Sequence, residues 1–328
     1  MLKKILVISI GIGLGFIAFL FFWRSTNRPW LQSAAPRAYQ LAPALPPEET
    51  LALLEHFNAA ATKRRAKLKS GVIEFTVTIS RLKTLFSKKA DYESRLKWDI
   101  IYRFSEQQRF YRIVERVKVK PGWFRRARWK ESKRYQFQED SNRRYGRVNR
   151  GDGWQWTSRH PIQLGDYHSP FHWKWDANLT QLTQMFGTIV DAQNIDEDEP
   201  YIKFENWRTD RIETTELWFD PRKDYRTTRG LQQVSFVNKA GTDRTAPDSG
   251  LLRTGTELSP RISKIHYTCQ LGQFNPDVWF PQSATERREV INLENSRFQA
   301  GQKIELQVHS ASFNVPIAVK DLVLFPDR

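Results

Sequence analysis

The chain lacks most of the residues and motifs by which enzymes and metalloproteins are recognised. It has one cysteine, Cys269, among 328 residues, which excludes a disulfide framework within the chain and a zinc cluster of cysteines. No phosphate-binding loop, nucleotide-binding glycine fingerprint or Gly-x-Ser-x-Gly nucleophile motif occurs. We therefore expect a protein that is not an enzyme and uses no cofactor.

Two short patterns resemble metal ligands, but neither is specific. His168 and His172 are four residues apart, yet Pro170 between them breaks the helix that would place both imidazoles on one side. The acidic run at 194–199 lacks the Asp-x-Asp-x-Asp-Gly order of a calcium loop, which favours a solvated turn. We expect no metal site.

Charge is absent from the stretch Ile5–Trp23. At about 1.5 Å of helical rise per residue, this run nearly matches the roughly 30 Å hydrocarbon core of a bilayer. The alternative is a cleaved signal peptide, but the small residues Ser33, Ala34 and Ala35 lie ten residues beyond the run, too far for ordinary processing. The sequence predicts a transmembrane anchor over residues 1–24, a Pro- and Ala-rich linker over 25–46, and one soluble domain over 47–328.

The side of the membrane is not decided by charge. Lys3 and Lys4 precede the apolar run, while Arg24, Arg28 and Arg37 follow it. Because the N-terminal tail is very short and long domains cross membranes largely regardless of charge, we expect the domain to be translocated. This predicts a single-pass protein of the inner (cytoplasmic) membrane, with its domain on the periplasmic side.

Periodicity predicts an α+β fold. A helix is expected from Pro47 to a cap at Gly71, and a second one over Asp176–Phe186 with Asp176 as its N-cap. Ile73–Ile79 and Leu96–Phe104 alternate apolar and polar residues, as strands with one wet face do. Further strands follow each helix, which favours a large antiparallel sheet over βαβ units.

Most of the net charge of +16 comes from one segment. Between Arg116 and Arg150 there are thirteen Lys or Arg and three Asp or Glu. Three interpretations are open: solvated strand faces, a patch drawn to an anionic leaflet, or, with the interleaved aromatic residues, a nucleic-acid surface. For a translocated domain we expect no nucleic acid, and we predict that Arg125, Arg126 and Arg128 contact lipid headgroups at an anionic membrane surface.

Three motifs carry a resemblance to a known family: Leu217-Trp218-Phe219-Asp220-Pro221, Val278-Trp279-Phe280-Pro281 and Phe313-Asn314-Val315-Pro316-Ile317. Together with an N-terminal helix that leads into long antiparallel strands, these motifs make the chain resemble the periplasmic lipoprotein carriers and the outer-membrane lipoprotein-sorting proteins. The resemblance covers roughly residues 47–328. The resemblance implies an unclosed β-barrel: a strongly curved antiparallel sheet, covered by a few helices, that holds acyl chains without covalent chemistry. An anchored chain fits a tethered receptor better than a soluble shuttle.

The predicted function is non-covalent binding of a lipid, an acyl chain or a lipoprotein in an apolar concavity. We expect six residues to line it: Phe75, Val77, Trp98, Ile100, Tyr102 and Trp218. The alternative is an envelope sensor or interaction protein of the same fold, in which these aromatic residues fill the core and the surface binds a protein partner.

Overall fold

The computed structural model describes most of the chain beyond the predicted anchor. The described residues are 37–39, 42–119, 127–140, 144–157, 178–193, 199–237, 256–275, 278–318 and 321–322. Neither α-helix within these ranges has the length and apolar character needed to cross a bilayer. The predicted transmembrane anchor, residues 1–24, lies outside them.

Fourteen strands form one antiparallel sheet. Thirteen of them follow the order β7-β6-β5-β4-β3-β2-β14-β13-β12-β11-β10-β9-β8, and β1 pairs with β12 outside that order. The strands are β1 (Arg37–Tyr39), β2 (Gly71–Leu82), β3 (Tyr92–Phe104), β4 (Gln108–Val119), β5 (Arg128–Asp140), β6 (Arg144–Asn149), β7 (Trp154–Trp156), β8 (Thr188–Gln193), β9 (Tyr201–Arg208), β10 (Arg211–Asp220), β11 (Arg226–Val237), β12 (Thr256–Asn275), β13 (Val278–Asn292) and β14 (Arg297–Phe313).

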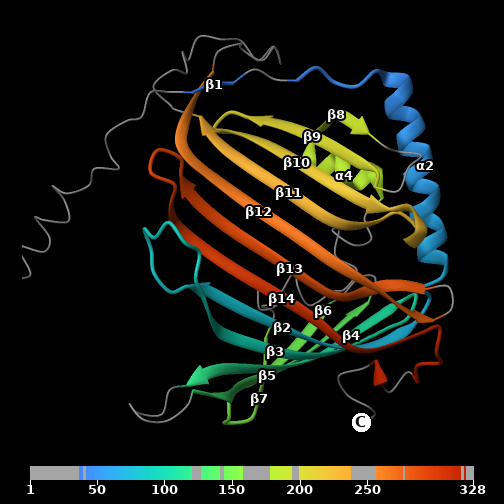
Figure 1. The fold of residues 1–328 in the computed structure, drawn as a ribbon. Helices are drawn as coiled ribbons and strands as arrows, with labels where there is room; N and C mark the ends of the chain where they lie inside the picture. Colours follow the sequence, from blue (N-terminus) through green and yellow to red (C-terminus); the bar gives the residue numbers. More distant parts are fainter. Residues whose placement is uncertain are drawn as a thin grey trace, which may run out of the picture.

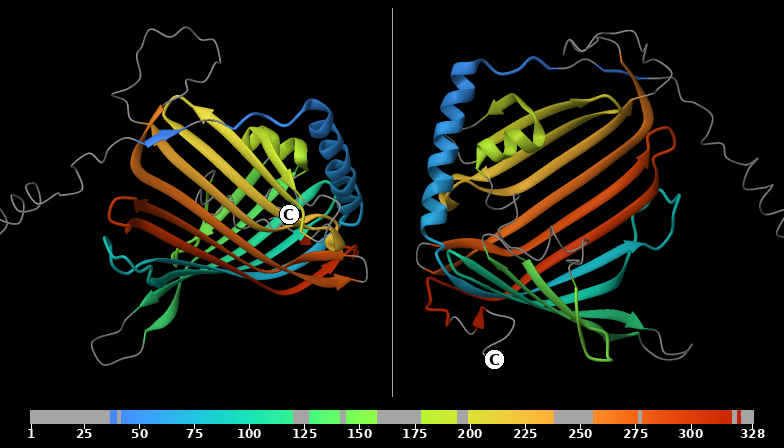
Figure 2. Two further views of the ribbon diagram at one scale, coloured as in Figure 1. Left: turned by 45° about the horizontal axis from the view of Figure 1, so that its top comes forward. Right: turned by 180° about the vertical axis from the view of Figure 1, so that it is seen from behind.

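The sheet is strongly curved, and its described end strands, β7 and β8, are not paired with each other (Figures 1 and 2). This confirms the prediction of a large, curved and unclosed antiparallel sheet accompanied by a few helices. Two α-helices accompany the described sheet, α2 (Pro47–Ala66) and α4 (Leu179–Phe186), with a 3₁₀ turn, η3 (Pro221–Lys223). Figure 2 shows α4 on the concave side of the sheet and α2 along its margin.

Both helices differ from the sequence prediction at one end. The helix α4 begins at Leu179 with Asn178 as its N-cap, in a capping box with Gln181, whereas Asp176 lies outside the described residues. The helix α2 ends at Ala66, and Gly71 begins β2 instead of capping the helix. The side chain of Asn314 provides a hydrogen bond just beyond the end of α2, because its Nδ2 donates to the Lys67 carbonyl at 2.7 Å.

Buried side chains form two large clusters. The first, here called the sheet core, contains only strand residues, from β2 to β6 and from β12 to β14. The second, here called the helix core, joins both helices to strands β8, β9 and β10. Its members are Leu53, Phe57, Leu179, Leu182, Phe186, Ile189, Ile202, Phe204, Leu217 and Phe219.

One row of register partners connects the two cores across the concave face. Residues directly opposite each other in an antiparallel pair project to the same face of a sheet. Starting from Leu217, against which the helices pack, the row therefore stays on the concave face. It runs Leu217, Gly230, Tyr267, Glu286, Ile304, Ile79, Leu96, Val117, Lys130.

Candidate functional site

Five of the six predicted lining residues come together on this concave face. Phe75 lies opposite Ile100 and Val77 opposite Trp98 on β2 and β3, with Tyr102 one step further along β3. All five belong to the sheet core and are at most 2 % exposed. The alternation of these two strands therefore predicted the buried face, and these side chains fill it.

Trp218 does not join them. Leu217 and Phe219, its neighbours on β10, point into the helix core, so the strand's alternation places Trp218 on the opposite face. There its ring lies 5.1 Å from that of Tyr201 and under the guanidinium of Arg229, at 4.2 Å. Trp218 is thus part of an aromatic and cationic cluster on the convex face, apart from the other five.

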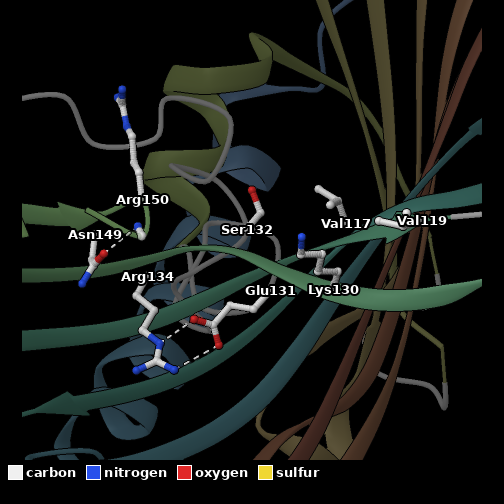
Figure 3. A pocket seen from close by; sticks show the side chains of 9 residues that line it. Val117, Val119, Lys130, Glu131, Ser132, Arg134, Asn149 and Arg150 are labelled. Carbon is white, nitrogen blue, oxygen red and sulfur yellow. Dashed lines mark hydrogen bonds and ion pairs between the residues drawn. The ribbon is translucent and has the colours of Figure 1, made fainter. Parts of the chain in front are cut away.

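An open hollow lies at the far end of the concave row, between β4, β5 and β6 (Figure 3). Its volume of about 690 Å³ falls within the roughly 300–1,000 Å³ of typical ligand pockets. It is lined by Val117, Val119, Lys130, Glu131, Ser132, Arg134, Asn149, Arg150 and Gly151. Val117 lies opposite Leu96, which packs against the sheet core, so the apolar floor of the hollow continues into that core.

The lining of the hollow carries an excess of positive charge. Glu131 and Arg134 form a two-point pair, with Arg134 Nε and Nη2 donating to the carboxylate at 2.7 and 3.1 Å. This hydrogen bonding lowers the pKa of Glu131 below its usual value. Lys130 and Arg150 add two further cations to the lining. The hollow as a whole suits a ligand with an apolar part and a negative group.

A buried polar cluster surrounds Glu115, which lies two residues before Val117 on β4. Trp98 Nε1 donates to Glu115 Oε2 at 3.3 Å, and Lys133 Nζ lies 3.5 Å from Glu115 Oε1. Burial is the main cause that raises the pKa of Tyr135 to about 12, and the nearby Glu115 carboxylate is the second. The hydroxyl of Tyr135 therefore stays protonated. Because Glu115 is only 8 % exposed, these hydrogen-bonding and charged partners compensate the hydration that its carboxylate loses.

Of the three predicted headgroup contacts, the structure describes one. Arg128 is exposed at the start of β5, two residues before Lys130 of the hollow. Arg125 and Arg126 lie outside the described residues, as do the candidate metal ligands His168 and His172. Within the described ranges, no group of three or more His, Cys, Asp or Glu side chains is arranged to hold a metal ion.

The sequence did not single out Val117, Ser132 or Lys130 as site residues. Their placement depends on a register shift between Glu115 and Arg116, where Ser132 is left without a partner on β4. The shift brings Val117 opposite Lys130 on the concave face. The only sequence pattern pointing to this region was the dense basic segment from Arg116 to Arg150.

No protein-family model matches this chain, and the search of curated proteins gave no match either.

Proposed function

We propose that this chain is a membrane-tethered envelope protein that binds an acyl chain non-covalently, with the anionic end of the ligand at the hollow between β4 and β6. The observation that carries the proposal is the composition of that hollow. Val117 and Val119 form an apolar floor that leads through Leu96 towards the sheet core, while Lys130 and Arg150 add cations at the same opening.

Each part of such a ligand has a physical counterpart in the hollow. Removing an alkyl chain from water is favourable by roughly 25 cal/mol per Å² of buried apolar surface. A carboxylate or phosphate group gains charge-assisted hydrogen bonds from lysine and arginine, which are roughly twice as strong as neutral ones. Neither contact requires a nucleophile, a general base or a bound metal, so the proposed activity is binding without catalysis.

The proposed location follows from the N-terminal sequence. The uncharged run Ile5–Trp23 would hold the domain at the inner membrane, and translocation would place it on the periplasmic side. A tethered domain beside the bilayer would meet lipids and lipoproteins at high local concentration. The resemblance to lipoprotein carriers is consistent with such a ligand.

Native mass spectrometry of the purified full chain with palmitic acid tests the proposal. We expect a bound palmitate on the wild-type chain and about tenfold weaker binding by Val117→Gln, equivalent to about 1.4 kcal/mol. Val72→Gln is the matched control, because Val72 is also a half-buried strand valine but lies on β2, opposite Arg103, and does not line the hollow. Equal losses in both variants would contradict a site in the hollow.

A second candidate function is supported by the filled sheet core. Phe75, Val77, Trp98, Ile100 and Tyr102 occupy the concave face almost without exposure, as they would in a sensor that binds a protein partner on its surface. A wild-type chain that takes up no fatty acid in the same experiment would favour this candidate. Palmitate uptake that depends on Val117 would exclude it as the sole function.

A further inference from the structure

Exposed aromatic and aliphatic side chains collect at one rim of the sheet. The rim contains the β2–β3 loop (residues 83–91) and the β6–β7 turn with β7 (residues 150–156), because both follow strands that end on this side (Figures 1 and 2). Leu85 and Phe86 are 51 % and 47 % exposed, and Trp154 and Trp156 are 41 % and 64 % exposed. We call these four residues the rim patch.

The β2–β3 loop is held in a shape that presents its apolar residues. Phe86 has φ of 62°, a left-handed conformation that is unusual for a bulky residue. Two backbone hydrogen bonds to β14 secure it, from Phe86 N to the Phe298 carbonyl at 2.7 Å and from Phe298 N to the Ser87 carbonyl at 2.9 Å. The loop is therefore pinned to the sheet while Leu85 and Phe86 project outwards.

The two tryptophans are held on an edge strand beside an arginine. Trp154 and Trp156 lie opposite Asn149 and Arg147 on β6, and the Arg147 guanidinium sits 4.6 Å from the centroid of the Trp154 ring. Gly151 and Gly153 have φ near +110°, which forms the tight turn before them. Tryptophan concentrates at membrane–water interfaces, since its ring is apolar and its N–H needs a polar partner.

Positive charge surrounds both parts of the rim patch. The loop at 83–91 has three lysines and one acid, and the segment 147–156 has two arginines and one acid. Lys88 and Lys89 are exposed, two and three residues after Phe86, whereas Lys83 pairs with Asp91 at 2.9 Å. The two connections follow β2 and β6, which are four steps apart in the strand order, or about 19 Å at the usual spacing of neighbouring strands. Such a span fits a broad, flat and anionic partner.

The first described segment of the chain, β1, lies at this same rim. Strand β1 pairs with the first residues of β12, Thr256 to Leu258. The beginning of β12 lies beside the end of β13, and the end of β13 lies beside the beginning of β14. The β13–β14 turn is on the same side as the β2–β3 loop. A chain arriving from a membrane would thus bring this rim towards the bilayer.

From these observations we infer that the rim patch docks on an anionic lipid bilayer, with Leu85, Phe86, Trp154 and Trp156 in the interfacial layer and the neighbouring lysines and arginines at phosphate groups. The inference rests on the proposed location beside a membrane, but not on a bound acyl chain. It orients the domain, because the hollow, lined by Lys130 and Arg150, then opens near the lipid surface from which a ligand would come.

An environment-sensitive fluorophore tests the docking on the full chain in bilayers. Asp152→Cys places a nitrobenzoxadiazole label at the exposed tip of the β6–β7 turn, and Gln107→Cys places it at the β3–β4 turn on the opposite rim. The native Cys269 is buried, so labelling is selective. In phosphatidylglycerol-rich bilayers, we expect blue-shifted emission and quenching by nitroxide lipids at position 152 and aqueous emission at position 107.

Variants then separate the apolar from the charged part of the contact. Trp154→Ser with Trp156→Ser, or separately Lys88→Glu with Lys89→Glu, is expected to return the label at position 152 towards aqueous emission. About 1 M salt, which reduces the Debye length to about 3 Å, should act in the same direction. The lysine pair is on an exposed loop, so this variant remains informative if the tryptophan variant misfolds.

Equal emission from positions 152 and 107 in anionic bilayers would overturn the inference. So would a response of position 152 to a single-stranded oligonucleotide but not to anionic lipid, which would make the patch a nucleic-acid surface. The Val117→Gln variant keeps the two proposals distinguishable: it should lose palmitate while the label at position 152 still reports docking.

Discussion

The two cores of the sheet are built differently. The helix core places Leu53 and Phe57 of α2 and Leu182 of α4 against strands β8 to β10, whereas the sheet core is made from strand residues alone. The open hollow lies at the end of the sheet core and none of its lining residues comes from a helix. Described helices therefore cover one half of the concave face, and the candidate site lies at the edge of the other half.

The row of register partners shows how the two halves remain one structure. Gly230 lies between Leu217 of the helix core and Tyr267 of the sheet core. A Cβ atom at Gly230 would come within 3.1 Å of Leu217 Cδ2, so the absence of a side chain lets the two cores approach each other. We expect the halves to unfold together unless the helix contacts are weakened selectively.

The largest effect should come from removing the indole at the centre of the sheet core. Trp98→Ala is expected to reduce the free energy of unfolding by about 4 kcal/mol, since it leaves a large cavity and removes a hydrogen bond to the buried Glu115. Urea denaturation measures the change. A loss below about 1 kcal/mol would mean that this core is not tightly packed.

Leu182→Ala should have a smaller and more local effect. Removing this side chain from α4 is expected to cost about 3 kcal/mol, because Leu182 is 1 % exposed within the helix core. Hydrogen exchange should show faster exchange in α4 and β8 than in β2 and β3. Equal acceleration in all four elements would contradict the separation of the two cores.

Charge removal at the hollow should affect ligand affinity without affecting the fold. For Lys130→Gln combined with Arg150→Gln, we expect about tenfold weaker palmitate binding, or about 1.4 kcal/mol, and unchanged binding of hexadecanol, which has no anionic end. Displacement of a fluorescent fatty acid measures both affinities. Equal weakening of acid and alcohol would indicate that the two cations do not contact the headgroup.

The smallest effect concerns pH. Burial lowers the pKa of His266 below its ordinary value, Arg287 and Lys264 lower it further, and Glu289 opposes the shift. The unfolded chain then binds the proton more tightly, so the contribution of His266 to stability is present above about pH 6.5 and is lost as pH falls below that value. Between about pH 7.5 and pH 5.5, the urea midpoint should fall more for wild type than for His266→Gln. An equal fall would contradict the shift.

Sequence alternation was sufficient for the parts of the fold that depend on local pattern. It placed β2 and β3, and it brought Phe75, Val77, Trp98, Ile100 and Tyr102 to one buried face. It did not distinguish the two faces of β10, where Trp218 and Phe219 are adjacent and both aromatic. Local composition says nothing about which of two such neighbours packs against a helix distant in sequence.

The candidate site depends on non-local features. A single unpaired residue, Ser132, sets which side of β5 carries Lys130, and such a register shift leaves no regular pattern in the sequence. Similarly, Arg37–Tyr39 lies in the predicted Pro- and Ala-rich linker but pairs with β12, more than two hundred residues later. Both features arise from strand pairing that only the assembled sheet determines.

Photo-crosslinking tests most directly whether the hollow holds an acyl chain. The full chain would be irradiated with a diazirine-bearing fatty acid, and the modified peptides identified by mass spectrometry. We predict crosslinks on peptides containing Leu96, Val117 or Lys130, reduced by Val117→Gln and unaffected by Val72→Gln. Crosslinks confined to the convex face around Trp218, or a pattern that ignores Val117, would contradict binding in the hollow.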